Sequence, residues 1–183
     1  MKGGTPPALS KLSAGADRVL GAAGSGRWAS ASVSAGRAAA AWRAHRRDDV
    51  PHRLVEPTDR ALEALRRAVR SKDTRGARNA ALDTTQATLD LQLRYRPAAE
   101  IDRARLDLWA TQVGVDAEAR DLKALSGDTA TIEWIRDRVA HTYPSAAITR
   151  IDTLLEQLRT NVTDKEPAAA ATTAAELQQA VKR

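Results

Sequence analysis

The chain has 183 residues, with 29 Lys or Arg against 23 Asp or Glu, so its formal net charge is +6. This length fits one ordinary domain, or one domain with a tail. The absence of cysteine excludes disulfides, thiolate metal sites and cysteine nucleophiles. Alanine supplies 38 residues, whereas Leu, Ile, Val and Phe together supply 33. Because alanine favours helices and lets helix axes approach closely, this composition predicts a thin-cored, all-α fold and excludes an all-β fold.

The N-terminal part of the chain is basic and poor in large apolar residues. Residues 1–26 are rich in glycine and serine, and they predict a flexible basic arm. A helix is expected over about 27–47, because Trp28 and Trp42 lie 14 residues apart and therefore on one helical face. The prolines that follow bound a loop, since a proline disfavours helix in the residue before it.

The rest of the chain carries apolar residues at helical spacing. The interruptions in this helical pattern predict three antiparallel helical hairpins, over about 58–96, 98–143 and 145–183. With the helix at 27–47 they form an antiparallel bundle of about six or seven helices. We expect this bundle to be a single domain over 27–183.

An internal repeat accompanies these hairpins. An offset of 93 residues superimposes 59–72 on 152–165 with seven identities in fourteen positions, and three alanines of the next helix then fall on alanines. Either an internal duplication or two amphipathic hairpins that share a period explains this match. A shorter match at an offset of 55 aligns Asp73 with Asp128 and predicts that each caps a helix N-terminus.

Motifs of catalysis and cofactor binding are missing from the sequence. It contains no glycine-rich phosphate loop, no His-Glu-x-x-His, no EF-hand loop and no Glu-x-x-His pair of the di-iron bundle type. We therefore predict a protein that is not an enzyme and that needs no cofactor.

One group of side chains has the spacing of metal ligands. Glu133, Asp137 and His141 recur every four residues, so they line one side of a helix and could offer two carboxylates and an imidazole to a divalent cation. The alternative is a solvated flank, in which the neighbouring Arg136 and Arg138 pair with these acids.

Basic residues near the N-terminus allow a nucleic-acid interpretation. Their cations could neutralise phosphates while Trp28 and Trp42 stack on bases. One alternative is a flexible, weakly basic N-terminus that precedes a helix whose tryptophans belong to the core. The other is a segment that contacts a membrane or directs transit. The candidate nucleic-acid ligands are Arg27, Arg37, Arg43, Arg46, Arg47, Arg66, Arg67 and Arg70.

Arg105 stands out because it lies on an apolar stripe, with Ile101 and Leu108. We expect its guanidinium to be partly buried against an acid such as Asp102. A bound anion is the other partner that this position allows.

Three segments carry a resemblance to a known group of proteins. The segment 89–97, with 100–105 and Trp109 after it, resembles uncharacterised secreted or lipid-anchored helical proteins of high-GC actinobacteria, and so does 132–141. The likeness covers about residues 28–160. It implies an extracytoplasmic location and a removed leader, but no activity. The chain lacks the paired His and Glu motif of extracytoplasmic iron-uptake bundles, so the resemblance does not imply iron binding.

These features predict a non-enzymatic, extracytoplasmic binding or scaffold module that holds a protein or peptide partner in a groove between hairpins. Without a leader the expected location is cytoplasmic. Nucleic-acid binding through the basic N-terminal segment is the alternative, and divalent-metal binding at Glu133, Asp137 and His141 is a weaker one. No transmembrane segment is expected. The sequence leaves the oligomeric state open.

Overall fold

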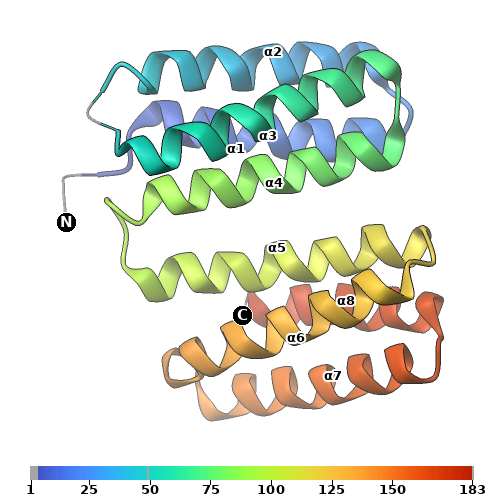
Figure 1. Cartoon of the computed structure of the whole chain (residues 1–183). Helices are drawn as coiled ribbons and strands as arrows, with labels where there is room; N and C mark the ends of the chain where they lie inside the picture. Colours follow the sequence, from blue (N-terminus) through green and yellow to red (C-terminus); the bar gives the residue numbers. More distant parts are fainter. Residues whose placement is uncertain (1–3, 49, 183) are drawn as a thin grey trace. The chain divides into compact units, whose positions relative to one another are not determined.

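A computed structural model describes residues 4–48 and 50–182 of the chain (Figure 1). Within these residues it contains eight α-helices, one short 3-10 helix and no strand. The all-α prediction is therefore confirmed, with more helices than the six or seven expected. In the same residues, no helix combines the length and the apolar character that crossing a membrane requires.

The chain divides into two compact units, which meet at Pro97 and Ala98 in the sequence. This differs from the single domain expected over 27–183. The physical reason is that the large apolar residues form two separate buried clusters, one drawn from residues 9–91 and the other from residues 106–181. Every predicted hairpin carries a similar apolar stripe, so the sequence pattern does not show which hairpins share a core.

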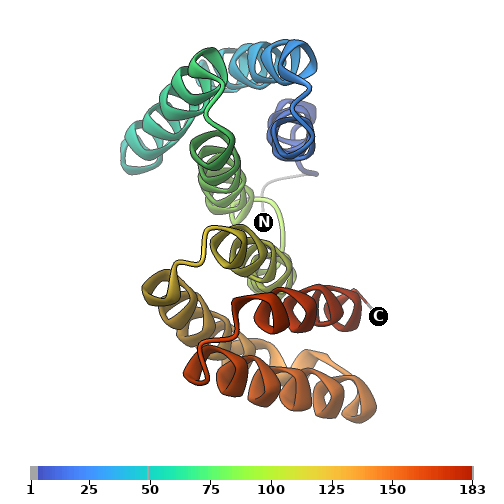
Figure 2. The same ribbon diagram turned by 90° about the vertical axis from the view of Figure 1, so that its right-hand side faces the viewer.

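Unit 1 is a four-helix bundle. Each helix packs against the next one, and α1 also packs against α4, which closes the bundle (Figures 1 and 2). Asp73 accepts a hydrogen bond of 2.9 Å from the Gly76 N–H and so caps α4, as predicted. Its helices are α1 (Pro7–Gly24), α2 (Trp28–His45), α3 (His52–Ser71) and α4 (Thr74–Gln92).

The first helix corrects the prediction of a flexible arm over 1–26. Residues 7–24 form α1, and Leu9, Leu12 and Val19 are fully buried. Gly15, at first sight a sign of flexibility, allows α1 to approach α2 closely, because a Cβ at this position would lie 2.8 Å from the Cβ of Ala38. The arm prediction is wrong for residues 7–24, and residues 1–3 lie outside the described residues.

Unit 2 has the same plan. Consecutive helices again pack against one another, and α5 packs against α8. The predicted hairpins 58–96, 98–143 and 145–183 correspond to α3–α4, α5–α6 and α7–α8. The helices of unit 2 are α5 (Ala98–Glu118), α6 (Leu122–Val139), the 3-10 helix η1 (Ala140–Thr142), α7 (Ser145–Thr163) and α8 (Pro167–Val181).

The turns of the two units match in backbone conformation. Gly26 and Arg120, 94 residues apart, have φ of 66° and 54° in the α1–α2 and α5–α6 turns. Lys72 and Lys165, 93 residues apart, have φ of 55° and 60° in the α3–α4 and α7–α8 turns. The same backbone hydrogen bonds close both members of each pair. These are all the described residues with positive φ.

Buried positions repeat at the same offsets. At an offset of 94, all six buried residues of α6 are equivalent to buried residues of α2. At an offset of 93, all buried residues of α7 and α8 are equivalent to buried residues of α3 and α4. Four residues of α1, among them Leu12 and Val19, fall on identical buried residues of α5. The offset falls by one because the α6–α7 connection is one residue shorter than the α2–α3 connection. The two units therefore repeat one four-helix plan.

The match at an offset of 55 does not reflect this repeat. Asp128 lies inside α6 and caps no helix, so that prediction is wrong. Asp121 is the cap instead, and it accepts a hydrogen bond of 3.1 Å from the Ala124 N–H.

Candidate functional site

A groove of about 620 Å³ lies along α1 and α2 of unit 1. Alanines form most of its lining, and cationic side chains of both helices border it. The lining residues are Ala8, Ser10, Lys11, Ala14, Arg18, Arg37, Ala40, Ala41 and Ala44.

The local sequence explains why a groove forms here. The glycine contact between Gly15 and Ala38 brings the two helix backbones together. Beside this contact, the positions of α1 and α2 that line the groove are mostly alanines. Their side chains end at Cβ and therefore fill little of the space between the helices.

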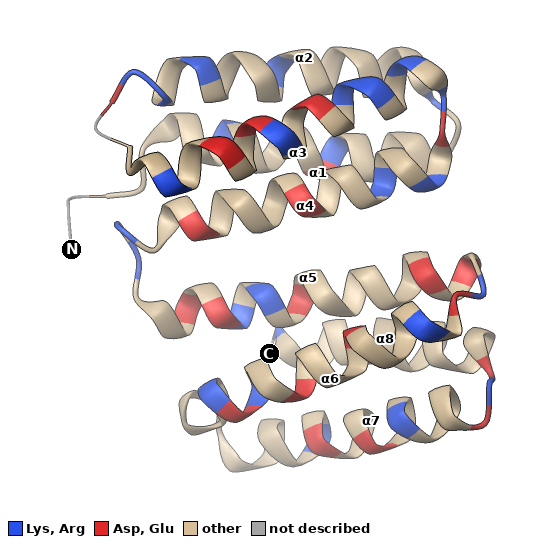
Figure 3. Ribbon diagram, in the orientation of Figure 1, with Lys and Arg blue, Asp and Glu red and all other residues tan. Residues whose placement is uncertain are grey.

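The groove has a single sign of charge. Lys11, Arg18 and Arg37 line it and are exposed, and no acidic residue is among its lining. Figure 3 shows that α2 carries basic but no acidic residues, in agreement with its sequence. Within the described residues, no carboxylate forms an ion pair with Lys11, Arg18 or Arg37. The groove therefore favours an anionic ligand.

The eight arginines of the nucleic-acid hypothesis all lie in unit 1 and are all exposed. The structure does not gather them at one place. Arg27 and Arg46 flank opposite ends of the 18-residue α2, about 27 Å apart. Arg37 lines the α1–α2 groove, whereas Arg67 lines a different hollow, along α3 and α4, and pairs with Glu63 at 3.3 Å.

Both tryptophans of this hypothesis contribute to the core of unit 1. Trp42 is only 3% exposed, and its indole Nε1–H donates a hydrogen bond of 2.7 Å to Asp59. Trp28 is half-buried and packs against the same apolar cluster. The interpretation of these residues as core tryptophans is confirmed. Trp42 cannot stack on a base without leaving the core.

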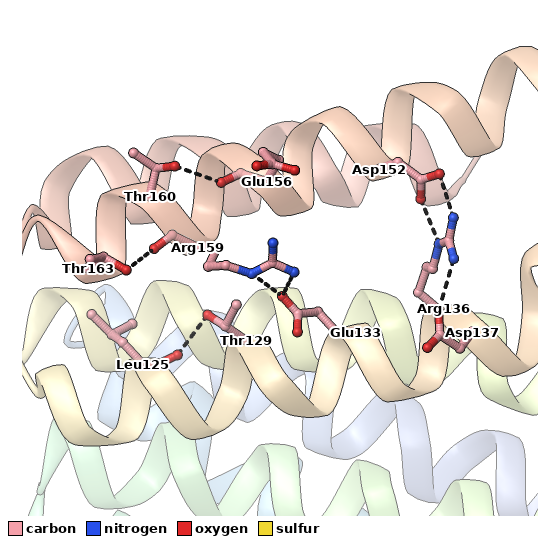
Figure 4. A network of polar contacts seen from close by, with 10 residues as sticks. All are labelled: Leu125, Thr129, Glu133, Arg136, Asp137, Asp152, Glu156, Arg159, Thr160 and Thr163. Carbon is pink, nitrogen blue, oxygen red and sulfur yellow. Dashed lines mark hydrogen bonds and ion pairs between the residues drawn. The ribbon is translucent and has the colours of Figure 1, made fainter.

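Two of the three proposed metal ligands, Glu133 and Asp137, are engaged in ion pairs (Figure 4). Glu133 accepts hydrogen bonds from Arg159 of α7, the shorter at 2.7 Å, and Asp137 pairs with Arg136 at 2.9 Å. His141 lies beyond the end of α6, in η1. Over the described residues, no three His, Cys, Asp or Glu side chains are grouped as a metal site requires. The structure therefore does not bring Glu133, Asp137 and His141 together as ligands.

Arg105 has the carboxylate partner that the sequence predicts. Its Nη1 lies 2.6 Å from Oδ1 of Asp102, and the two side chains are 14% and 4% exposed. Arg138 of α6 approaches the other oxygen of Asp102 at 2.7 Å. One buried carboxylate thus pairs with two guanidinium groups.

Sequence reasoning missed a pair of buried carboxyl groups, Asp116 of α5 and Asp128 of α6. Burial, and then the charge and hydrogen bond of Asp116, raise the pKa of Asp128 to about 7, with a further contribution from Asp121. Oδ2 of Asp128 is buried without a hydrogen-bond partner. The sequence does indicate that Asp128 is buried, because it lies between Leu125 and Ile132 on the apolar side of its helix.

Another hollow, of about 760 Å³, lies at one end of unit 2. It is formed by the α5–α6 turn, the α7–α8 turn and the first residues of α8. Its charged lining residues are Glu118, Arg120, Lys165 and Glu166, so the two signs balance. Unlike the α1–α2 groove, it shows no preference for a charged ligand.

The fold and the groove together define a class of protein, a tandem pair of four-helix bundles whose first unit carries a basic, alanine-lined groove. Comparison of the chain with protein-family models, with curated proteins and with solved structures gives no match.

Proposed function

We propose that the chain is a non-enzymatic binding module that holds a protein or peptide partner in the α1–α2 groove. The observation that carries this proposal is the groove itself, in which an alanine lining is bordered by three exposed cations. Small side chains let the backbone of a partner helix approach closely, and cations at the rim give orientation and speed association.

The proposal can be tested with designed peptides and the full chain. Three amphipathic helical peptides would share one apolar face and carry acidic, neutral or basic residues on the polar face. Each would be titrated into the labelled chain while the amide resonances are followed by NMR. We expect at least one peptide to shift the resonances of groove residues such as Ser10 and Ala40.

A matched pair of variants locates the binding. Ala40→Trp places a large side chain on the groove lining, whereas Ala130→Trp makes the same change at an exposed position of α6 in unit 2. Binding should be lost in the first variant and retained in the second. If no peptide binds, or if both variants bind as the parent chain does, the proposed function is wrong.

We further propose an extracytoplasmic location, which rests on the sequence resemblance alone. Fractionation of cells that express the native gene with a C-terminal tag tests it. Recovery of the protein from the cytoplasmic fraction alone would contradict this location, and it would leave the proposed binding function standing.

A further inference from the structure

The internal repeat indicates what fills the groove. This inference rests on the proposed function and concerns the chemistry of the partner. Since α1 and α2 correspond to α5 and α6 at an offset of 94, each groove residue of unit 1 has a known equivalent in unit 2.

Unit 2 carries large side chains where unit 1 carries alanines. The equivalents of Ala14, Ala40 and Ala44 are a leucine, a tryptophan and an arginine. In unit 2 this arginine stacks on this tryptophan, with 4.6 Å from Cζ of Arg138 to the ring centre of Trp134. Unit 2 therefore carries larger side chains at the positions where alanines line the groove of unit 1, and Trp134 is 60% exposed there.

The charges differ in the same way. Asp102, which is buried and pairs with both Arg105 and Arg138, is equivalent to Ala8. Lys11 is the equivalent of Arg105, so unit 1 keeps a cation at this position without the carboxylate that pairs with it in unit 2.

We propose that the α1–α2 groove binds an acidic amphipathic helix of a protein partner. This helix supplies a carboxylate for Lys11, as Asp102 does for Arg105 in unit 2, together with the bulky apolar side chains that the alanine lining lacks. Lys11 and Arg18 are seven residues apart on α1, about 10 Å along its axis. A partner helix along α1 meets them with acidic residues about two turns apart. Its apolar side chains then cover Ala40 and Ala44, with Arg37 on the opposite rim.

Charge opposes a two-fold symmetric pairing of this groove with the same groove of a second copy. In a two-fold symmetric dimer the same patch meets itself, which would place Lys11, Arg18 and Arg37 against the same three cations. A nucleic acid fits less well than an acidic helix, because an alanine lining offers no aromatic surface for bases and Trp42 is buried.

The test compares two peptides that differ only in charge. One carries Glu at two positions seven residues apart beside a Leu and Trp seam, and the other carries Gln at those two positions. We expect the Glu peptide to bind the full chain at least about tenfold more tightly, with an advantage that shrinks as salt rises.

Two charge reversals locate the effect on the groove. Lys11→Glu should weaken binding of the Glu peptide by about tenfold or more. It should strengthen binding of a third peptide, which carries Lys at the same two positions. Arg66→Glu makes the same change at an exposed position of α3 outside the groove lining, and we expect it to change binding by less than about twofold. Circular dichroism would confirm that both variants keep the helical fold.

The outcomes separate this inference from the proposed function. If the Gln peptide binds as tightly as the Glu peptide and Ala40→Trp abolishes both, the acidic partner is wrong and the binding function stands. If neither these peptides nor the basic one binds, the binding function itself fails. If a labelled DNA or RNA oligonucleotide displaces the Glu peptide and binds more tightly, the groove recognises nucleic acid and the acidic helix is overturned.

Discussion

At the scale of single residues, the two buried carboxyl sites of unit 2 have opposite consequences. Asp102 is buried with two guanidinium groups against it, whereas Asp128 is buried beside another carboxyl group. Burial of a charge is tolerated in the first case because cations compensate for the lost hydration. In the second case protonation removes the negative charge of Asp128, so the ionisation state of this side chain depends on pH.

Asp128 should make the free energy of unfolding depend on pH. Its pKa is about 7 in the folded chain and near 3.8 when unfolded, so the folded state holds the proton more tightly. Its stabilising effect is complete below about pH 4 and is lost as pH rises through about 7. We expect urea unfolding to show a loss of roughly 2–4 kcal/mol between about pH 4 and about pH 8 from this group.

Asp128→Ser provides the comparison, because unit 1 has Ser34 at the equivalent position. This variant should lose most of that pH dependence and should be more stable than the parent chain at about pH 8. Asp137→Ser removes an exposed carboxylate from the same helix and should leave the pH profile unchanged. Equal profiles for the parent chain and Asp128→Ser would show that the buried pair does not control stability.

Asp102→Ala tests the compensated site. It removes the buried Asp102 carboxylate that pairs with Arg105, which is 14% exposed, and we expect a loss of about 2–4 kcal/mol in thermal or urea unfolding. Asp137→Ala, at a carboxylate that is 71% exposed, should cost less than about 0.5 kcal/mol. A small effect at Asp102 would mean that both arginines find water or other partners.

At the scale of helices, the spacing between α1 and α2 is set by one glycine. In Gly15→Ala the new Cβ would lie 2.8 Å from the Cβ and 3.1 Å from the backbone of Ala38, so the helices must separate. Overpacking of this kind costs about 1–3 kcal/mol, which exceeds the gain of about 1 kcal/mol in helix propensity. We expect a lower melting temperature and weaker peptide binding in the groove.

The control for this prediction is Gly36→Ala in α2. A Cβ at Gly36 meets nothing within 4 Å, so the substitution should raise the free energy of unfolding by about 0.5–1 kcal/mol. If Gly15→Ala stabilised the chain to the same extent, the close approach of the two helices would not be a constraint.

Helical periodicity predicted the elements better than it predicted their assembly. The stripe of Leu62, Leu65 and Val69 marks α3 clearly, and all three residues are buried. In α1, glycines and serines separate the few large apolar residues, so the sequence pattern does not mark a helix face there. The groove could not be predicted at all, because it depends on how α1 and α2 pack side by side.

At the scale of the whole chain, the repeat builds two separate cores on one four-helix plan. Each unit closes its own ring of four helices and has its own buried cluster. Some buried alanines of unit 1 have larger apolar residues at the equivalent positions of unit 2. Ala38 and Ala41, for example, are equivalent to Ile132 and Ile135. The core volume therefore differs between units that share one backbone plan, and unit 2 carries the larger apolar residues along α6.

This division predicts that each unit folds by itself. We expect the chains 1–97 and 98–183, expressed separately, to be helical by circular dichroism and to unfold cooperatively, since each retains a complete apolar cluster. The fragment 98–183 should keep the pH dependence that Asp128 confers, and the fragment 1–97 should lack it, because Ser34 stands at the equivalent position. A fragment 98–183 that is unfolded alone, or a pH effect of equal size in both fragments, would contradict the independence of the two cores.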